Sequence, residues 1–295
     1  MRDIIQHLIE MALDEDIGTG DITTSALIDP NLHAIGRITA KQSLVLAGID
    51  VVKKTFEMVD ANITWDPKRK DGERCEVGDV VAIVQGQAHA LIKAERTALN
   101  FLQRLSGIAT TTRKFVDAIS DTNAKILDTR KTLPAYRFLE KHAVKVGGGT
   151  NHRFGLFDHF LIKNNHLTAV GSITEAMKRA QKARKPGQLL EVEVRLPVEV
   201  EAAVAGNADI IMLDNMSVEN VKKAIKLIKG RAKTEVSGNI TLDNIHSYAS
   251  TGVDFISVGA ITHSAPAADI HMLIMVEKKA GEHSISSFES VSGRS

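Results

Sequence analysis

The sequence predicts an α/β protein with two domains: a sheet domain with a covering helix, followed by a barrel of parallel strands. Up to about residue 93, short β-prone segments alternate with turn residues after one amphipathic helix. From about Lys93, apolar strand segments alternate with helical patterns in at least six β–α steps over about 150 residues, as in a parallel sheet. No Gly-x-Gly-x-x-Gly turn follows the first of these strands, which favours a closed or nearly closed barrel over an open sheet.

The first domain begins with a helix and continues with strands. Apolar residues between Ile4 and Leu13 recur near helical spacing, and Gly18 or Gly20 ends this helix. Residues 72–84 have the pattern of a turn that leads into a strand. A long helix is predicted from Ala94 to about Ile119.

The barrel strands are predicted from buried apolar segments. These segments are Lys125–Leu127, Phe160–Ile162, Leu189–Val194, Ile210–Leu213, Thr234–Val236 and Phe255–Val258. Between them, residues 173–180 place apolar side chains at i, i+3, i+4 and i+7, which predicts one buried helix face. Pro197 suits the first turn of the next helix and Gly206 its C-terminal cap.

The composition excludes several classes of function. Lys and Arg number 37 and Asp and Glu 36, so the net charge of +1 argues against a nucleic-acid binder that depends on bulk positive charge. Aromatic residues make up 4%, too few for a surface that stacks nucleic-acid bases. No apolar segment approaches the ~20 residues of a membrane span. Cys75 is the single cysteine, so neither an intramolecular disulfide nor a cysteine metal cluster is expected, and we expect a cytoplasmic protein.

Charged residues or glycines follow each predicted barrel strand. In a β/α barrel these C-terminal strand ends form the active-site face. Four cations gather there, with His152 beside them: Arg130, Lys131, Arg153 and Lys163. Guanidinium groups match carboxylates and phosphates, so this set predicts an anionic substrate; surface salt bridges are the alternative.

Two carboxylates follow neighbouring strands. Glu193 and Asp214 supply the hard oxygen ligands that Mg²⁺ prefers, and Mg²⁺ is often held by one or two carboxylates together with substrate phosphates. The pair is therefore a candidate metal–diphosphate site; neutralisation of the nearby cations remains the alternative. His159 and His166 have no partner at zinc-ligand spacing, and we interpret them as structural.

Small residues form turns after the last two strands. Late-strand loops of β/α barrels commonly bind phosphate through backbone N–H groups. The predicted phosphate-binding residues are Ser237, Gly238, Asn239, Val258, Gly259 and Ala260. The ring of side chains therefore suits an anionic small molecule beside a phosphorylated one, and no Ser-His-Asp or Cys-His nucleophile arrangement is evident.

Several long motifs, in order, resemble the quinolinate phosphoribosyltransferase family. The motifs are Glu15–Asp21, Glu95–Asn100, Asp128–Thr132, Gly149–Arg153, Ile162–His166, Leu213–Asn215 and Glu235–Asn239. The resemblance implies an N-terminal open α/β sandwich domain (residues 1–112), an incomplete TIM-like α/β barrel (113–267) and a segment (268–295) that returns to the first domain. It implies transfer of phosphoribose from 5-phosphoribosyl 1-diphosphate to quinolinate, with decarboxylation and Mg²⁺, in NAD biosynthesis.

The resemblance also assigns roles to residues. Arg130, His152, Arg153 and Lys163 would bind the quinolinate carboxylates, with Thr129 beside them. Arg96 would enter from the partner in a head-to-tail homodimer, which sometimes assembles further into a hexamer. Lys131 would meet the diphosphate, and Glu193 and Asp214 would hold the ribose hydroxyls and Mg²⁺. Lys131, Lys163, Glu193 and Asp214 are the expected catalytic residues.

One position departs from the family pattern. Arg195 stands where an acidic residue is common, and strand alternation places it on the same face as Glu193. It either pairs with that glutamate or faces a loop. The polar, Ser-rich tail from about Ala280 to Ser295 is expected to be mobile, and we assign it no function.

Two alternative functions are open from the sequence. One is a paralogue of the same fold associated with molybdenum transport, and the other is a non-catalytic barrel that binds a phosphometabolite. A relative that uses nicotinate would need fewer cations, because its substrate has one carboxylate instead of two. The four cations together favour the quinolinate enzyme.

Overall fold

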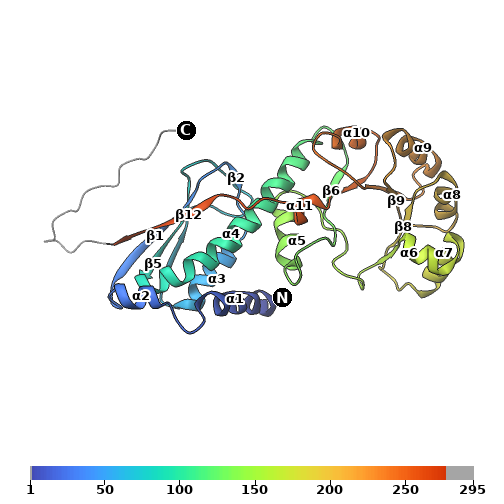
Figure 1. The fold of residues 1–295 in the computed structure, drawn as a ribbon. Helices are drawn as coiled ribbons and strands as arrows, with labels where there is room; N and C mark the ends of the chain where they lie inside the picture. Colours follow the sequence, from blue (N-terminus) through green and yellow to red (C-terminus); the bar gives the residue numbers. More distant parts are fainter. Residues whose placement is uncertain (1, 277–295) are drawn as a thin grey trace.

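The N-terminal domain is an antiparallel sheet covered by helices (Figure 1). The computed structural model describes residues 2–276, and the predicted polar tail lies outside them. The sheet has the strand order β12-β1-β5-β3, so the last described strand returns to pair with the first. The elements of this domain are α1 (Arg2–Ile17), α2 (Ile22–Leu27), β1 (His33–Ala40), β2 (Leu44–Val45), α3 (Ile49–Val59), β3 (Thr64–Pro67), β4 (Arg74–Cys75), β5 (Val80–Gln87), α4 (Ala88–Asp117) and β12 (Ile270–Val276).

Strand β1 buries every second residue, as a sheet with one covered face requires. Its inward residues Ala34, Ile38 and Ala40 join a hydrophobic cluster with Leu91 and Ala98 of α4. The sheet is therefore held against α4 by apolar side chains of one face.

Helix α4 connects the two domains. It has 30 residues, which corresponds to about 45 Å, and in Figure 1 it runs from the sheet into the barrel. The returning chain crosses it at Gly107, where a Cβ atom would lie 2.0 Å from the Pro266 carbonyl oxygen. The predicted start at Ala94 is wrong: the helix begins at Ala88, and Gln87 offers no side-chain capping bond that the sequence would reveal.

The C-terminal domain is an incomplete barrel of parallel strands. Its elements are β6 (Lys125–Leu127), α5 (Arg137–Val146), β7 (Phe160–Ile162), α6 (Asn164–Val170), α7 (Ile173–Ala183), β8 (Leu190–Val194), α8 (Pro197–Ala205), β9 (Ile210–Asp214), α9 (Val218–Ile228), β10 (Lys233–Ser237), α10 (Ile245–Ala249), β11 (Phe255–Ser257) and α11 (Ala260–His263). The strand order is β6-β11-β10-β9-β8-β7. A single parallel bridge from Leu127 to Thr150 places residues 150–153 beside β6, at the opening between β6 and β7.

Local signals set most of these elements. All six predicted strands are present, with ends that differ by at most one residue. As predicted, Pro197 begins α8 and Gly206 follows its last residue. The prediction of a barrel rather than an open sheet is confirmed, because β11 pairs with β6 and joins the last barrel strand to the first.

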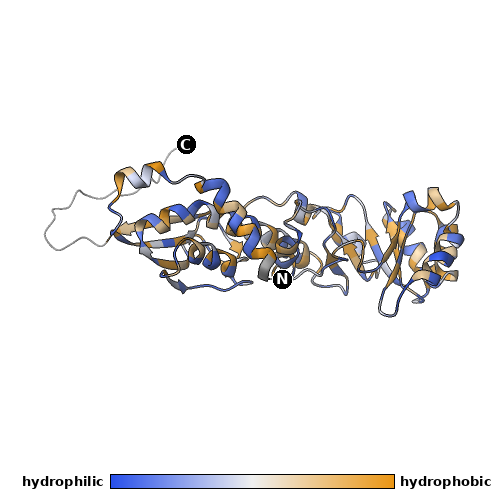
Figure 2. Ribbon diagram, turned by 90° about the horizontal axis from the view of Figure 1, so that it is seen from below, coloured by the Kyte–Doolittle hydropathy of each residue, from blue (hydrophilic) through white to orange (hydrophobic). Residues whose placement is uncertain are grey.

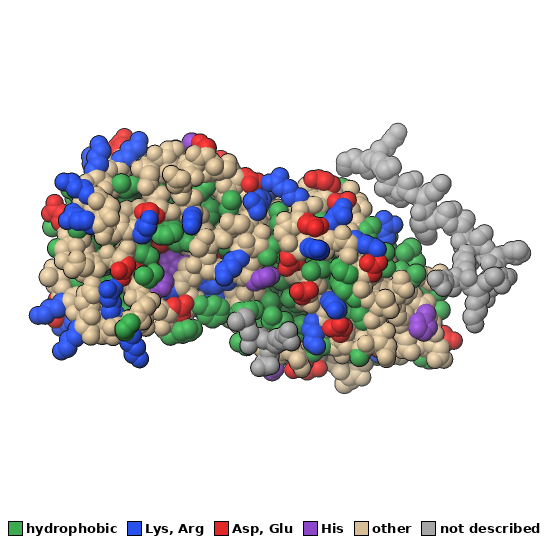
Figure 3. Space-filling model, turned by 180° about the vertical axis from the view of Figure 1, so that it is seen from behind, with side chains coloured by type: hydrophobic (Ala, Val, Ile, Leu, Met, Phe, Trp, Pro, Cys, Tyr) green, Lys and Arg blue, Asp and Glu red, His purple; other side chains and the backbone are tan. Residues whose placement is uncertain are grey.

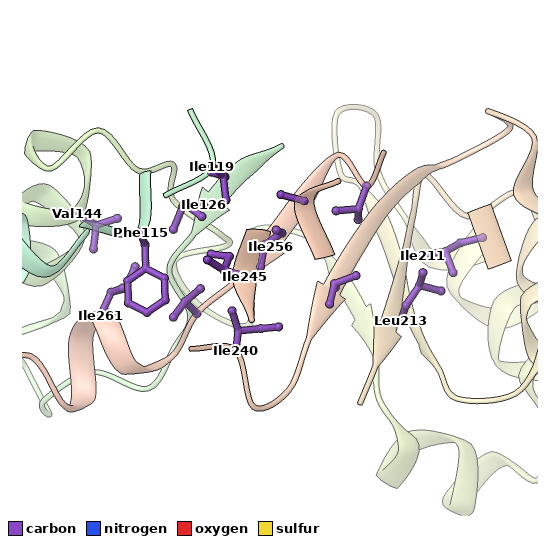
Figure 4. Packing of buried hydrophobic residues seen from close by; sticks show 14 of the residues in the cluster. Phe115, Ile119, Ile126, Val144, Ile211, Leu213, Ile240, Ile245, Ile256 and Ile261 are labelled. Atoms are coloured by element: carbon purple, nitrogen blue, oxygen red, sulfur yellow. The ribbon is translucent and has the colours of Figure 1, made fainter. Parts of the chain in front are cut away.

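The main core lies between the barrel strands and the helices around them. Phe115 of α4 packs in one buried cluster with Val144 and Ile261, so the end of α4 belongs to the barrel core (Figure 4). Figure 2 shows the two domains end to end, with hydrophobic segments along their strands.

The surface carries charges of both signs, as the near-equal numbers of basic and acidic residues predict. On the face shown in Figure 3, Lys and Arg side chains are interspersed with Asp and Glu. Among the described residues, no helix is both long and apolar enough to cross a membrane.

Candidate active site

A cavity of about 750 Å³ lies at the C-terminal ends of the barrel strands. It brings together fourteen of the fifteen predicted site residues, from six strands and the loops after them. These residues are Thr129, Arg130, Lys131, His152, Arg153, Lys163, Glu193, Asp214, Ser237, Gly238, Asn239, Val258, Gly259 and Ala260. The fifteenth, Arg96, is exposed on α4 and does not line this cavity.

Two guanidinium groups form the cationic wall of the cavity. Arg153 is 7% exposed, and its Nη1 donates a hydrogen bond to the His159 carbonyl oxygen at 3.3 Å. The Nε atoms of Arg153 and Arg130 are buried and have no hydrogen-bond partner among the described residues. Burial and the nearby charge of Arg130 both lower the pKa of Arg153. An anion beside these guanidinium groups would relieve the repulsion between the two cations.

His152 lies in the cavity wall, but both of its ring nitrogens contact protein groups. Nδ1 accepts a hydrogen bond from the backbone N–H of Arg153 at 2.7 Å. Nε2 lies 3.1 Å from Oε2 of Glu191 and 3.6 Å from Oε1 of Glu235, toward the barrel interior. His152 still lines the cavity, and its contact with a substrate carboxylate stays a prediction.

Glu193 and Asp214 face the cavity from neighbouring strands and share one cation. Arg195 Nη2 lies 2.9 Å from Asp214 Oδ2 and 3.3 Å from Glu193 Oε1. Of the two orientations open from the sequence, Arg195 thus takes the one that pairs with the glutamate, and it contacts the aspartate as well. Burial and the adjacent Asp214 charge raise the pKa of Glu193, so a further cation between the two acids would stabilise both.

These two acids also meet the chemical requirements of a divalent metal. Both are oxygen donors at adjacent strand ends in a cavity wide enough for a phosphorylated substrate. The donor set therefore fits Mg²⁺ bound jointly by carboxylates and substrate phosphates.

The turn after β10 has a backbone that suits phosphate binding. Gly238 has φ +104°, and a Cβ atom at this position would lie 2.2 Å from Asn215 Oδ1. Asn239 Nδ2 donates to the same Asn215 oxygen at 3.3 Å, and the backbone N–H of Asn215 donates to the Ser237 carbonyl at 2.8 Å. The turn is therefore compact, and the absence of a side chain at Gly238 lets Asn215 pack against it.

A buried layer, to which the sequence assigned no role, lies under the cavity. Glu191 and Glu235 are both 0% exposed inside the barrel. Strand alternation carried a signal for them, because each lies two residues before a predicted site residue, Glu193 or Ser237. His159 carried no such signal; its ring centroid lies 5.5 Å from that of His152.

Comparison with known proteins identifies the family. The profile of the quinolinate phosphoribosyl transferase N-terminal domain matches residues 21–106, and that of the C-terminal domain matches residues 108–273. The chain belongs to the quinolinate phosphoribosyltransferase family.

Individual relatives agree over nearly the full length. The chain is 43% identical to a probable nicotinate-nucleotide pyrophosphorylase [carboxylating] of Bacillus subtilis, over 94% of this chain and 96% of the relative. It is 42% identical to the nicotinate-nucleotide pyrophosphorylase [carboxylating] of Mycobacterium leprae, over 91% of this chain and 96% of the relative. The crystal structure of NadC from Streptococcus pyogenes superposes with a TM-score of 0.91 at 41% identity, covering 94% of this chain and 99% of that one.

These matches confirm the predicted family and fold, and the enzyme is a phosphoribosyltransferase. They support the carboxylating nicotinate-nucleotide pyrophosphorylase reaction and neither the molybdenum-associated paralogue nor the binding barrel.

Proposed function

We propose that this cavity joins quinolinate to the ribose of 5-phosphoribosyl 1-diphosphate, releasing diphosphate and CO₂ and forming nicotinate mononucleotide. One observation carries the proposal: the four predicted cations and two carboxylates line a single cavity. The cations suit a dicarboxylate, and the carboxylates suit a sugar that becomes positively charged.

Arg130, Arg153 and Lys163 bind the two carboxylates of quinolinate. Charge-assisted hydrogen bonds from guanidinium groups fix the plane of the ring, which directs its nitrogen toward the donor sugar. His152 supports this wall through its bond to the Arg153 backbone.

The donor lies on the opposite side of the cavity. The turns at Ser237–Asn239 and Val258–Ala260 bind its 5-phosphate through backbone N–H groups, and Lys131 meets the diphosphate. Glu193 and Asp214 hold the ribose hydroxyls and Mg²⁺, which when bound neutralises charge on the diphosphate.

The reaction needs no protein nucleophile. The ring nitrogen forms a bond to C1 of the ribose while the C1–oxygen bond breaks and its electron pair leaves with diphosphate. Glu193 and Asp214 stabilise the positive charge that develops on the sugar, and Lys131 stabilises the leaving group. The ring nitrogen is now positive, so the adjacent carbon–carboxylate bond can break; its electrons stay on the ring, which then takes one proton.

The working unit that we propose is a head-to-tail homodimer. Arg96 lies outside the cavity of its own chain and is exposed on α4, as a residue that serves the partner's cavity must be. Assembly into a hexamer and a cytoplasmic location remain predictions from the sequence and the resemblance.

A direct assay tests the function. The purified chain receives quinolinate, 5-phosphoribosyl 1-diphosphate and Mg²⁺, and a parallel reaction receives nicotinate instead. We expect nicotinate mononucleotide and CO₂ from quinolinate alone. Asp214→Asn should lower kcat by roughly 10²-fold, whereas the matched change Asp50→Asn, exposed on α3, should not. Product from nicotinate only, or donor binding without turnover, would overturn the proposal.

A further inference from the structure

Two acids lie inside the barrel, directly beneath the cavity, and the proposed reaction does not use them. Glu191 of β8 and Glu235 of β10 are 0% exposed. Each side chain lies on the same face of its strand as the cavity residue two positions later, Glu193 or Ser237. The two acids therefore form the layer below the cavity. Burial of two carboxyl groups is costly without partners, which makes their contacts informative.

His152 connects Glu191 to the substrate wall. Its Nε2 donates a hydrogen bond to Glu191 Oε1 at 3.4 Å, with Oε2 of the same group at 3.1 Å. Because Nδ1 accepts the Arg153 backbone N–H at 2.7 Å, the neutral ring carries its proton on Nε2. A continuous path therefore runs from the Glu191 carboxylate through the ring to the backbone of Arg153.

The backbone of His152 is held on its other side by a buried ion pair. Its N–H donates to Asp128 Oδ1 at 2.8 Å, and Lys141 Nζ donates to its carbonyl oxygen at 3.0 Å. Asp128 and Lys141 also contact each other. The backbone here is thus fixed, and the ring contact with Glu191 sets the remaining orientation.

The two buried acids differ in their partners. Oε2 of Glu191 lies 3.1 Å from Nε2 of His152 and 3.5 Å from Nε2 of His159. Burial and the Glu191 charge raise the pKa of Glu235 to about 8, so it holds a proton at neutral pH. Ser257 Oγ donates to Glu235 Oε1. Glu191 is therefore the acid of the pair that contacts both imidazole rings.

We propose that Glu191 is a positioning residue for the dicarboxylate substrate: it orients the His152 ring and, through it, the Arg153 backbone and guanidinium in the cationic wall. This inference rests on the proposed quinolinate binding. It requires Glu191 to act on the acceptor side of the cavity, because its hydrogen-bonded path through the His152 ring leads to Arg153.

Glu191→Gln tests the inference, with Glu235→Gln as the matched control. Glutamine keeps the shape but replaces a charge-assisted hydrogen bond with a weaker neutral one. We expect Glu191→Gln to raise the KM for quinolinate roughly tenfold, with the KM for the donor and kcat within about twofold. Glu235→Gln replaces a group that already holds a proton, so its constants should stay within about twofold of wild type.

If Glu191 acts only through its charge, the quinolinate KM should change in the opposite direction. Removing a negative charge beneath a cationic wall would tighten anion binding and lower the quinolinate KM. A lower or unchanged quinolinate KM in folded Glu191→Gln, or equal effects of the two glutamine variants, would overturn the inference. Failure of the wild-type enzyme to use quinolinate would instead overturn the proposed function.

His152→Asn supplies a second route if Glu191→Gln does not fold. Asparagine can still accept the Arg153 N–H but is too short to reach Glu191, so the quinolinate KM should again rise. The double variant should be no worse than either single one, because both cut the same path. His152, His159 and Glu191 also bring three metal-binding atoms within 4.8 Å of one another. One zinc per chain in the wild type, lost in Glu191→Gln, would overturn positioning in favour of a metal site.

Discussion

Arg195 and Asp214 form an ion pair across the donor side of the cavity. The Nη2 and Nε atoms of Arg195 lie 2.9 and 3.1 Å from the same oxygen, Oδ2 of Asp214. Nη2 also lies 3.3 Å from Glu193 Oε1. The guanidinium therefore contacts the two carboxylates to which we assign Mg²⁺ and the ribose hydroxyls.

Arg195→Ala should strengthen metal binding to the donor-free protein. The two carboxylates lose a competing cation, so their affinity for the metal should rise. Because Arg195 is 50% exposed and such ion pairs are weak, we expect the affinity to rise roughly two- to fivefold. Titration with Mn²⁺, followed by electron paramagnetic resonance, measures it. Lys233→Ala, which breaks an exposed pair with Asp254, is the control. Equal Mn²⁺ affinity in Arg195→Ala and wild type would contradict competition.

Gly238→Ala should weaken donor binding. The new Cβ would lie 2.2 Å from Asn215 Oδ1 and force the phosphate-binding turn to move. We expect the KM for 5-phosphoribosyl 1-diphosphate to rise by about tenfold or more, with a smaller change for quinolinate. Gly252→Ala carries similar backbone strain, at φ +88°, but meets no atom within 4 Å. If both variants raise the donor KM equally, the clash with Asn215 is not the cause.

Mixing two inactive variants should restore activity if Arg96 serves the partner. Arg96→Ala and Lys163→Ala subunits that exchange form mixed dimers with one intact cavity. Initial rates before and after exchange measure the recovery. Arg96→Ala mixed with the double variant Arg96→Ala/Lys163→Ala should stay inactive, since no intact cavity can form. Absence of recovery in the first mixture, despite demonstrated exchange, would place Arg96 outside the neighbouring site.

Glu140→Ala should destabilise the junction between α4 and α5. Glu140 is 0% exposed and accepts bonds from Nε and Nη2 of Arg104 at 3.1 and 2.6 Å. Its removal leaves a guanidinium unpaired at a largely buried site, so the free energy of unfolding should fall by about 3–5 kcal/mol in urea. Asp117→Ala, which breaks an exposed pair with Arg74, should cost less than about 1 kcal/mol. Similar losses in the two variants would refute this account.

Glu235 should make the protein less stable as pH rises. Its pKa is raised from 4.5 to about 8 in the folded state, so between these values the folded protein binds more protons than the unfolded chain. Stability from this group is complete below about pH 4.5 and is lost as pH rises through 8. Urea unfolding of wild type and Glu235→Gln across pH 5–9 should show the steeper decline in the wild type. Parallel curves would mean that Glu235 does not titrate in this range.

The sequence alone was enough to predict the barrel and most of the cavity. Strand alternation and the β–α repeat are local patterns, and parallel strands in a barrel end on one face. The predicted site residues from Thr129 to Ala260 line the same cavity, and His152 and Arg153 reach it from the segment that pairs with β6 at Thr150. The start of α4 was predicted incorrectly because Gln87 gives no capping signal.

Only the tertiary structure decided which side chains meet across the barrel. His152 faces Glu191 and Glu235, which are 39 and 83 residues away in sequence, because strand pairing brings three distant segments around one interior. Arg195 likewise turned toward two acids rather than a loop. Residue types and their spacing determine which groups are available at the strand ends. The orientation of a ring, the protonation of a buried acid and the partners of an ion pair depend on distances between segments that no local pattern encodes.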